Sequence, residues 1–156
     1  MLKSLAIRDI VLIERLELAF DDGLSVLTGE TGAGKSIILD ALGLALGGRS
    51  DRGLVRGGAG QGSVVALLEP GAAPAVQALL DDNAIPFEGE LILRRIVTAD
   101  GRSRAFVNDT AVSTGLLRQL GDLLVEVHGQ FDQRGLLNPQ THRAVLGLVR
   151  HAGRFE

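Results

Sequence analysis

The sequence predicts one α/β domain with a mixed sheet, in which an antiparallel meander of short strands joins core strands that carry a phosphate loop. Three observations support this fold class. Apolar and polar residues alternate over much of residues 2–20, which is typical of half-buried strands. An apolar run at 24–28 leads into a glycine-rich turn and then a helical stripe of apolar residues. The 156 residues are 46% hydrophobic, which is enough for one domain with its own core.

The first part of the chain is expected to hold three strands. The first runs through Leu5 and Ile7, and the second spans 11–20 up to a turn at 21–23. The run at 24–28 is expected to be a short buried strand directly before the glycine-rich turn.

A helix is predicted over 36–46, where apolar residues recur at helical spacing. Gly47 and Gly48 are expected to end it, and residues 47–62 to form a glycine-rich loop. The elements expected beyond this loop are a buried strand at 63–69, a short helix at 74–82, a β-hairpin with strands at 90–98 and 104–108, a helix from Ser113 to Leu120 that Gly121 ends, a buried strand at 123–127 and a helix from Pro139 towards Glu156.

Composition excludes several classes of site. The chain has no cysteine, so it can hold neither a disulfide nor a thiolate metal site. The net charge of −3 argues against a domain that binds DNA by charge alone, and the absence of Trp and Tyr argues against base stacking. No apolar run approaches the length of a membrane span, and the first residues lack a signal-peptide pattern. We therefore expect a cytoplasmic protein.

The strongest motif is a phosphate loop that fits the pattern G-x-x-x-x-G-K-[ST] in full. Its residues are Gly29, Glu30, Thr31, Gly32, Ala33, Gly34, Lys35 and Ser36. Glycines let the backbone N–H groups curl around a polyphosphate, and the positive end of the following helix faces the same phosphates. Lys35 is expected to reach the β- and γ-phosphates, Ser36 to coordinate Mg²⁺, and Ile37 to close the binding segment. ATP and Mg²⁺ are the expected cofactors.

Several weaker candidates accompany this loop. Gln130 follows a predicted buried strand, where a polar side chain of an α/β sheet points into the ligand crevice. Glu69 and Glu126 are the only acids that could end a second buried strand, although neither fits the usual acidic pair. The remaining candidates for phosphate, nucleotide or DNA contacts, each with an ordinary exposed surface as the alternative, are Arg8, Asp9, Arg49, Arg52, Arg56, Arg94, Arg95, Arg102 and Arg104.

Taken together, these sequence features resemble the N-terminal half of an SMC-like, ABC-type ATPase head, and more specifically the RecN family of bacterial DNA repair proteins. The resemblance covers nearly the whole chain. The stretches that carry it are 28–36, 40–43, 46–49, 100–108 and 127–130.

This resemblance implies several further properties. Gln130 becomes the Q-loop residue that contacts Mg²⁺ and water. The signature and Walker B motifs are expected in a C-terminal lobe beyond this chain, with residues 1–138 as the N-terminal lobe and 139–156 as the root of a coiled coil. The resemblance also implies a homodimer with ATP sandwiched between two heads. It further implies DNA as a partner of the complete protein, which would then be nucleoid-associated.

Two other functions stay open from the residues themselves. The chain could be a self-contained kinase or NTPase that uses Glu69 or Glu126 as its acid. It could also be a non-catalytic module in which nucleotide only stabilises a partner-binding surface. ATP turnover by the chain alone separates the first alternative from the half-head reading.

Overall fold

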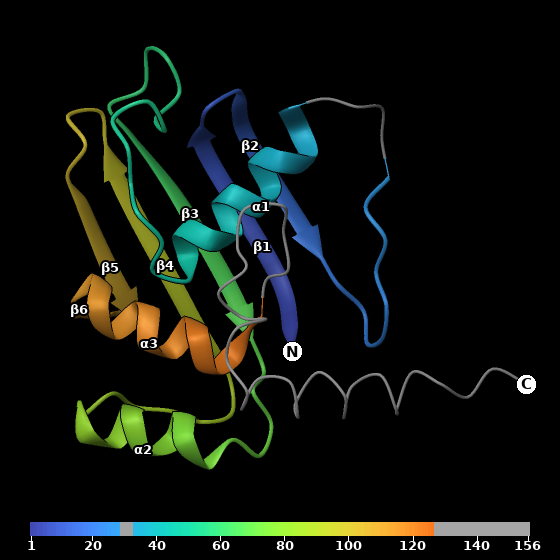
Figure 1. Ribbon diagram of the computed structural model, residues 1–156, viewed down its shortest axis with the longest axis vertical. Helices are drawn as coiled ribbons and strands as arrows, with labels where there is room; N and C mark the ends of the chain where they lie inside the picture. Colours follow the sequence, from blue (N-terminus) through green and yellow to red (C-terminus); the bar gives the residue numbers. More distant parts are fainter. Residues whose placement is uncertain (29–32, 127–156) are drawn as a thin grey trace, which may run out of the picture. The chain divides into compact units, whose positions relative to one another are not determined.

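The computed structural model describes residues 1–28 and 33–126. Residues from Met1 to Leu124 form one compact unit, whose described strands make a six-stranded sheet in the order β2-β1-β3-β4-β5-β6 (Figure 1). Every neighbouring pair in it is antiparallel. The strands are β1 (Leu2–Ile10), β2 (Ile13–Ala19), β3 (Gln61–Leu68), β4 (Leu91–Thr98), β5 (Ser103–Val107) and β6 (Thr110–Val112).

Helices cover one face of the sheet, so buried and more exposed side chains alternate along the strands. The side chains of β3 and β4 alternate strictly between buried and more exposed positions, because successive residues of a strand point to opposite faces. Helices α1 (Ala33–Ala45) and α3 (Thr114–Leu124) lie on the same side of the sheet (Figure 1). The core between these helices and the sheet is aliphatic. Its largest fully buried side chains include Leu5, Ile7, Leu68, Leu91, Leu93, Leu117 and Leu120.

The expected antiparallel meander, the strand at 63–69, the helix at 74–82 and the hairpin are confirmed. Helix α2 spans Pro74–Asp82, with its proline in the first turn. Ser113 caps α3 as expected, because its Oγ accepts a hydrogen bond from the Leu116 N–H at 3.1 Å. No helix in the described part of the chain is long and apolar enough to cross a membrane.

The predicted strand at 24–28 is wrong, because these residues have no regular secondary structure. Leu24 is 93% exposed and Val26 71% exposed. A strand needs a neighbour that pairs with its backbone N–H and C=O groups, and none of the described residues pairs with this segment. The run therefore has strand-forming side chains but no ladder to join.

The predicted strand at 123–127 is also wrong over the residues that the structure describes. Leu123 and Leu124 form the last turn of α3, and Val125 and Glu126 have no regular structure. A short apolar run fits the end of a helix as well as a strand, because so few residues do not show a period. Leu123 is in fact 50% exposed. Val127 lies outside the described residues.

Gly121 does not end α3, which continues to Leu124. A Cβ at Gly121 would lie 2.5 Å from the carbonyl oxygen of Leu46, so this glycine allows α3 to pack closely against the segment that follows α1. The helix predicted from Pro139 lies outside the described residues. The division into 1–138 and 139–156 stays a prediction.

Candidate functional site

The candidate site is built on the first turn of α1. Lys35 is half-buried there, Ser36 is exposed, and the Ile37 side chain is 7% exposed and part of the core. The turn has no acidic side chain, so nothing in it opposes an anion at the positive end of the helix. Residues Gly29–Gly32 lie outside the described part of the chain.

Apolar side chains fix α1 against the sheet and thereby orient its first turn. Ile37, Ala41, Leu44 and Ala45 are buried, and their spacing of four, three and one residues lines one face of a helix. With this face against the sheet, the exposed Ser36 is free to meet a ligand.

The other end of α1 is closed by a tight turn. The Gly48 N–H donates to the Gly43 carbonyl at 2.8 Å, and the Gly47 N–H donates to the Leu44 carbonyl at 3.2 Å. This is the pattern of a Schellman motif, with Gly47 at φ +90°. The predicted helix end at Gly47 and Gly48 is confirmed.

The chemistry of this first turn fits a nucleoside triphosphate with Mg²⁺. An ammonium group suits the charge of a phosphate, and a serine hydroxyl is a hard oxygen ligand of the kind that Mg²⁺ prefers. Both groups lie in one turn at the positive end of a helix. The described residues contain no cluster of three or more His, Cys, Asp or Glu that would offer an alternative metal site.

Asp9 and Arg8 are placed at the carboxyl end of β1. Asp9 has φ +50° and its Oδ1 accepts a hydrogen bond from Arg56 Nε at 3.1 Å, while its carbonyl accepts from the Arg56 N–H at 2.9 Å. Asp9 therefore holds the loop after α1 against β1. Arg8 is exposed and follows the buried Ile7, so its side chain points to the face of the sheet opposite α1. The structure does not bring Arg8 to Lys35 and Ser36.

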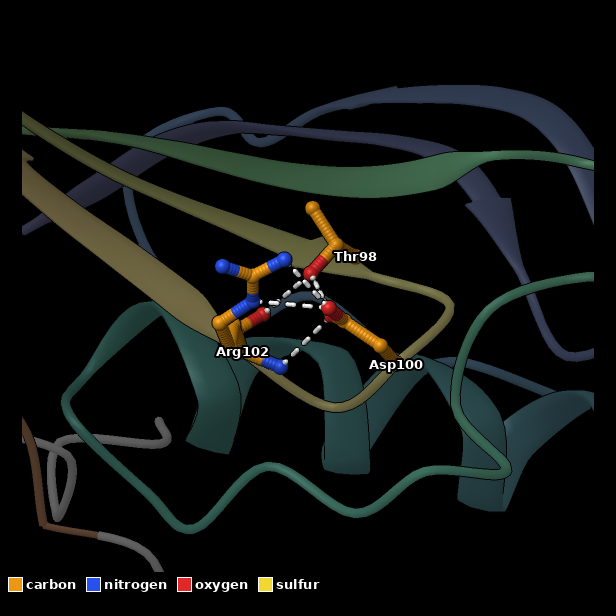
Figure 2. A network of polar contacts seen from close by, with 3 residues as sticks. All are labelled: Thr98, Asp100 and Arg102. Atoms are coloured by element: carbon orange, nitrogen blue, oxygen red, sulfur yellow. Dashed lines mark hydrogen bonds and ion pairs between the residues drawn. The ribbon is translucent and has the colours of Figure 1, made fainter.

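Arg52 lies against the β4–β5 turn. A Cβ at Gly101, which has φ +89°, would lie 2.8 Å from Arg52 Cγ. Within this turn Arg102 Nε donates to Asp100 Oδ2 at 2.7 Å and the Thr98 hydroxyl donates to Asp100 Oδ1 (Figure 2). The hydrogen bond from Arg102 lowers the pKa of Asp100 well below its ordinary value of 3.8. Arg102 is thus paired within its own turn.

Glu69, one of the two candidate acids, lies away from the first turn of α1. Glu69 directly follows β3, and its Oε2 lies 3.3 Å from Lys3 Nζ. The carboxyl end of β3 and the start of α1 lie at opposite ends of the sheet (Figure 1). Hydrogen bonds to Asp22 and Glu69 raise the pKa of Lys3. Glu126 follows the end of α3 by two residues and does not end a strand.

Gln130 lies outside the described residues, so its role stays a prediction.

Sequence reasoning missed one residue. The sequence predicts an exposed Arg95 beside the other arginines of the hairpin, but its side chain is 2% exposed. It is the single buried charged side chain among the residues that the structure describes. The alternation of β4 could have found it, since Leu91, Leu93, Arg95 and Val97 share one face of the strand.

Comparison with known proteins points in one direction. Residues 4–83 match the family described as an AAA domain. The chain is 42% identical over 162 residues to DNA repair protein RecN of Vibrio cholerae, an alignment covering 97% of this chain and 29% of that protein. It is 43% identical over 153 residues to DNA repair protein RecN of Halalkalibacterium halodurans, covering 94% of this chain and 26% of that protein. The predicted resemblance to RecN is confirmed.

A solved structure shows the same fold. It is a chain from work on ATP-driven dimerization and DNA-stimulated activation of SMC ATPases, which matches with a TM-score of 0.66 at 20% identity. The match covers 95% of this chain and 98% of that chain. The predicted fold class, that of an SMC-type head, is confirmed. The chain spans less than a third of the RecN relatives.

Proposed function

Because the chain belongs to the AAA domain family, whose match covers residues 4–83, we propose that it binds ATP with Mg²⁺ through Gly29–Ser36. The observation that carries this proposal is the start of α1, where Lys35 and the exposed Ser36 occupy a first turn without acidic side chains. In this site Lys35 binds the β- and γ-phosphates and Ser36 coordinates the metal. When bound, Mg²⁺ neutralises charge on the phosphates, and Gln130 is proposed to orient the attacking water.

The proposal extends to an incomplete ATPase head. The chain is the N-terminal lobe of an SMC-like head, and a C-terminal lobe supplies the signature and Walker B motifs. Two heads then sandwich two ATP molecules, and hydrolysis drives DNA tethering in double-strand break repair. The length ratio to the RecN relatives supports this reading.

Exposed apolar side chains give the same proposal a physical basis. Leu24, Val26 and Leu27 leave 93%, 71% and 44% of their surface exposed, and Leu39 of α1 leaves 53% exposed. Such residues next to a functional loop indicate a surface that another part of the protein covers. A C-terminal lobe that adds a strand beside 24–28 would bury them.

The test is Mg²⁺-dependent ATP turnover by the chain alone and by the chain combined with the C-terminal lobe. We expect no turnover by the folded chain alone, weak ATP binding, and activity when the lobe is added. Lys35→Ala should abolish both binding and activity. The chain has only one other lysine, so Lys3→Ala is the matched control and should keep the activity.

Turnover by the chain alone, above the Lys35→Ala background, would contradict the half-head proposal. It would favour a self-contained NTPase with Glu69 or Glu126 as its acid. If ATP is bound but not hydrolysed, both by the chain alone and by the chain combined with the C-terminal lobe, the non-catalytic alternative holds.

A further inference from the structure

Arg95 occupies a core position that an aliphatic side chain would normally fill. It stands on the inner face of β4 between the buried Leu93 and Val97, and only 2% of its surface is exposed. No ion pair within the described part of the chain includes Arg95. Burying a cation without a carboxylate is costly, and burial lowers the pKa of Arg95. Packing alone does not explain why a guanidinium stands here.

The guanidinium is directed at the end of α1. Its Nη1 donates to the Gly48 carbonyl at 3.1 Å and lies 3.4 Å from the Leu44 carbonyl. Its Nη2 donates to Ser103 Oγ at 2.9 Å, at the start of β5. The carbonyls at the end of a helix carry partial negative charge, so α1 itself supplies the counter-charge. Arg95 thus ties the last turn of α1 to two strands of the sheet.

The hydrogen bonds of Arg95 fix the position of α1 along its own axis, which apolar packing fixes less well. The buried face of α1 includes the small side chains Ala41 and Ala45, which interlock little with the sheet. Each dispersion contact is also weak and non-directional. Hydrogen bonds from a planar guanidinium are directional and fix position along that axis.

The opposite end of the same helix carries Lys35 and Ser36. Leu44 lies nine residues beyond Lys35, so about 14 Å of helix separates them. Arg95 therefore does not touch the nucleotide, but any shift of α1 that its loss permits appears at the first turn.

We infer that Arg95 is a positioning residue for nucleotide binding, which sets the place of Lys35 and Ser36 by anchoring the far end of α1 to β4 and β5. This rests on the proposed function in so far as the first turn of α1 binds ATP. The hairpin formed by β4 and β5 then supports the nucleotide site by positioning α1, without contacting the ligand.

The first experiment needs no nucleotide. Backbone amide NMR shifts of Lys35 and Ser36 are measured in the unliganded chain and in Arg95→Met, Arg95→Lys and Arg94→Met. Arg94 is the matched control, because it is the adjacent arginine but lies 4.4 Å over the Phe106 ring, on the other face of β4. We expect Arg95→Met to move both amides, Arg95→Lys to move them less, and Arg94→Met to leave them in place.

The second experiment measures the Kd for Mg²⁺-ATP of the same variants, in the chain combined with its C-terminal lobe. We expect Arg95→Met to weaken binding by about 10- to 100-fold, as a remote displacement of binding groups can, and Arg95→Lys to recover part of it. Melting temperatures show that the variants compared are folded. If Arg95→Met does not fold, Arg95→Lys and Ser103→Ala take its place.

Unshifted Lys35 and Ser36 amides in a folded Arg95 variant would overturn the inference. So would an unchanged Kd. If the wild-type protein is folded and does not bind ATP, the proposed function fails, whereas the amide shifts still report whether Arg95 positions the helix.

Discussion

Replacing Gly121 by alanine tests the contact between α3 and the segment after α1. A Cβ at this position would lie 2.5 Å from the Leu46 carbonyl oxygen and 2.9 Å from Leu46 Cβ. Real Cβ atoms essentially never approach other heavy atoms within 3.0 Å. The closest obstacle is a backbone oxygen, which cannot rotate away as the end of a side chain can. Either α3 or the backbone at Leu46 has to shift to admit the methyl group.

Two opposing contributions set the size of the effect. Alanine stabilises a helix interior by about 1 kcal/mol relative to glycine. Overpacking of a close contact costs about 1–3 kcal/mol, and more when the backbone must move. Because the clash at Gly121 is with backbone, we expect the cost to prevail and the free energy of unfolding to fall by about 1–2 kcal/mol. That corresponds to a melting temperature lower by about 2–8 °C.

The assay is urea and thermal unfolding of Gly121→Ala beside Gly43→Ala. Gly43 is the matched control, because it also lies within a helix but a Cβ there would meet nothing within 4 Å. We expect Gly43→Ala to gain about 0.5–1 kcal/mol from helix propensity alone. A Gly121→Ala chain as stable as the wild type would refute the close packing of α3.

Two further substitutions have clear expected outcomes. Ser113→Ala removes the cap of α3 and should lower the free energy of unfolding by about 1 kcal/mol, while Ser113→Thr should keep most of it; equal unfolding curves for all three chains would show that the cap is not needed. Asp100→Asn removes a carboxylate whose folded pKa is depressed by Arg102, so the stability it contributes is present above its ordinary pKa of 3.8 and is lost as the pH falls through the lower folded value. The difference in melting temperature between wild type and Asp100→Asn should therefore be present at neutral pH and become smaller in acid. A difference that does not depend on pH would contradict the pairing of Asp100 with Arg102.

Much of the sheet could be predicted because its strands have one covered and one open face. In β3 and β4 this arrangement leaves an alternation that can be read directly from the residues. The phosphate loop could be recognised because its chemistry needs fixed residue types at fixed spacing.

The errors arise where one residue pattern serves two physical roles. A glycine after a helical stripe predicts a helix stop at Gly121, but a glycine also permits a close approach of two backbones. Only the position of Leu46 distinguishes the two roles. The run at 24–28 has the composition of a strand, yet a strand also requires a partner, which sequence composition does not report. Residue type predicts an exposed Arg95, because arginine usually is exposed, whereas its neighbours on β4 place it on the inner face of the sheet.

The pairing of β1 with β3 constrains how a growing chain can fold. Leu5 pairs with Ala66, whereas its other neighbour on the sheet, Leu18, lies only a short hairpin away. A ribosome adds about 5–20 residues per second, so β3 is synthesised several seconds after the hairpin of β1 and β2. A lone hairpin is marginally stable, and α1 meanwhile has no completed surface to rest on. The segment that carries Lys35 and Ser36 is thus translated well before the sheet that holds it in place, and contacts so distant in sequence slow its closure.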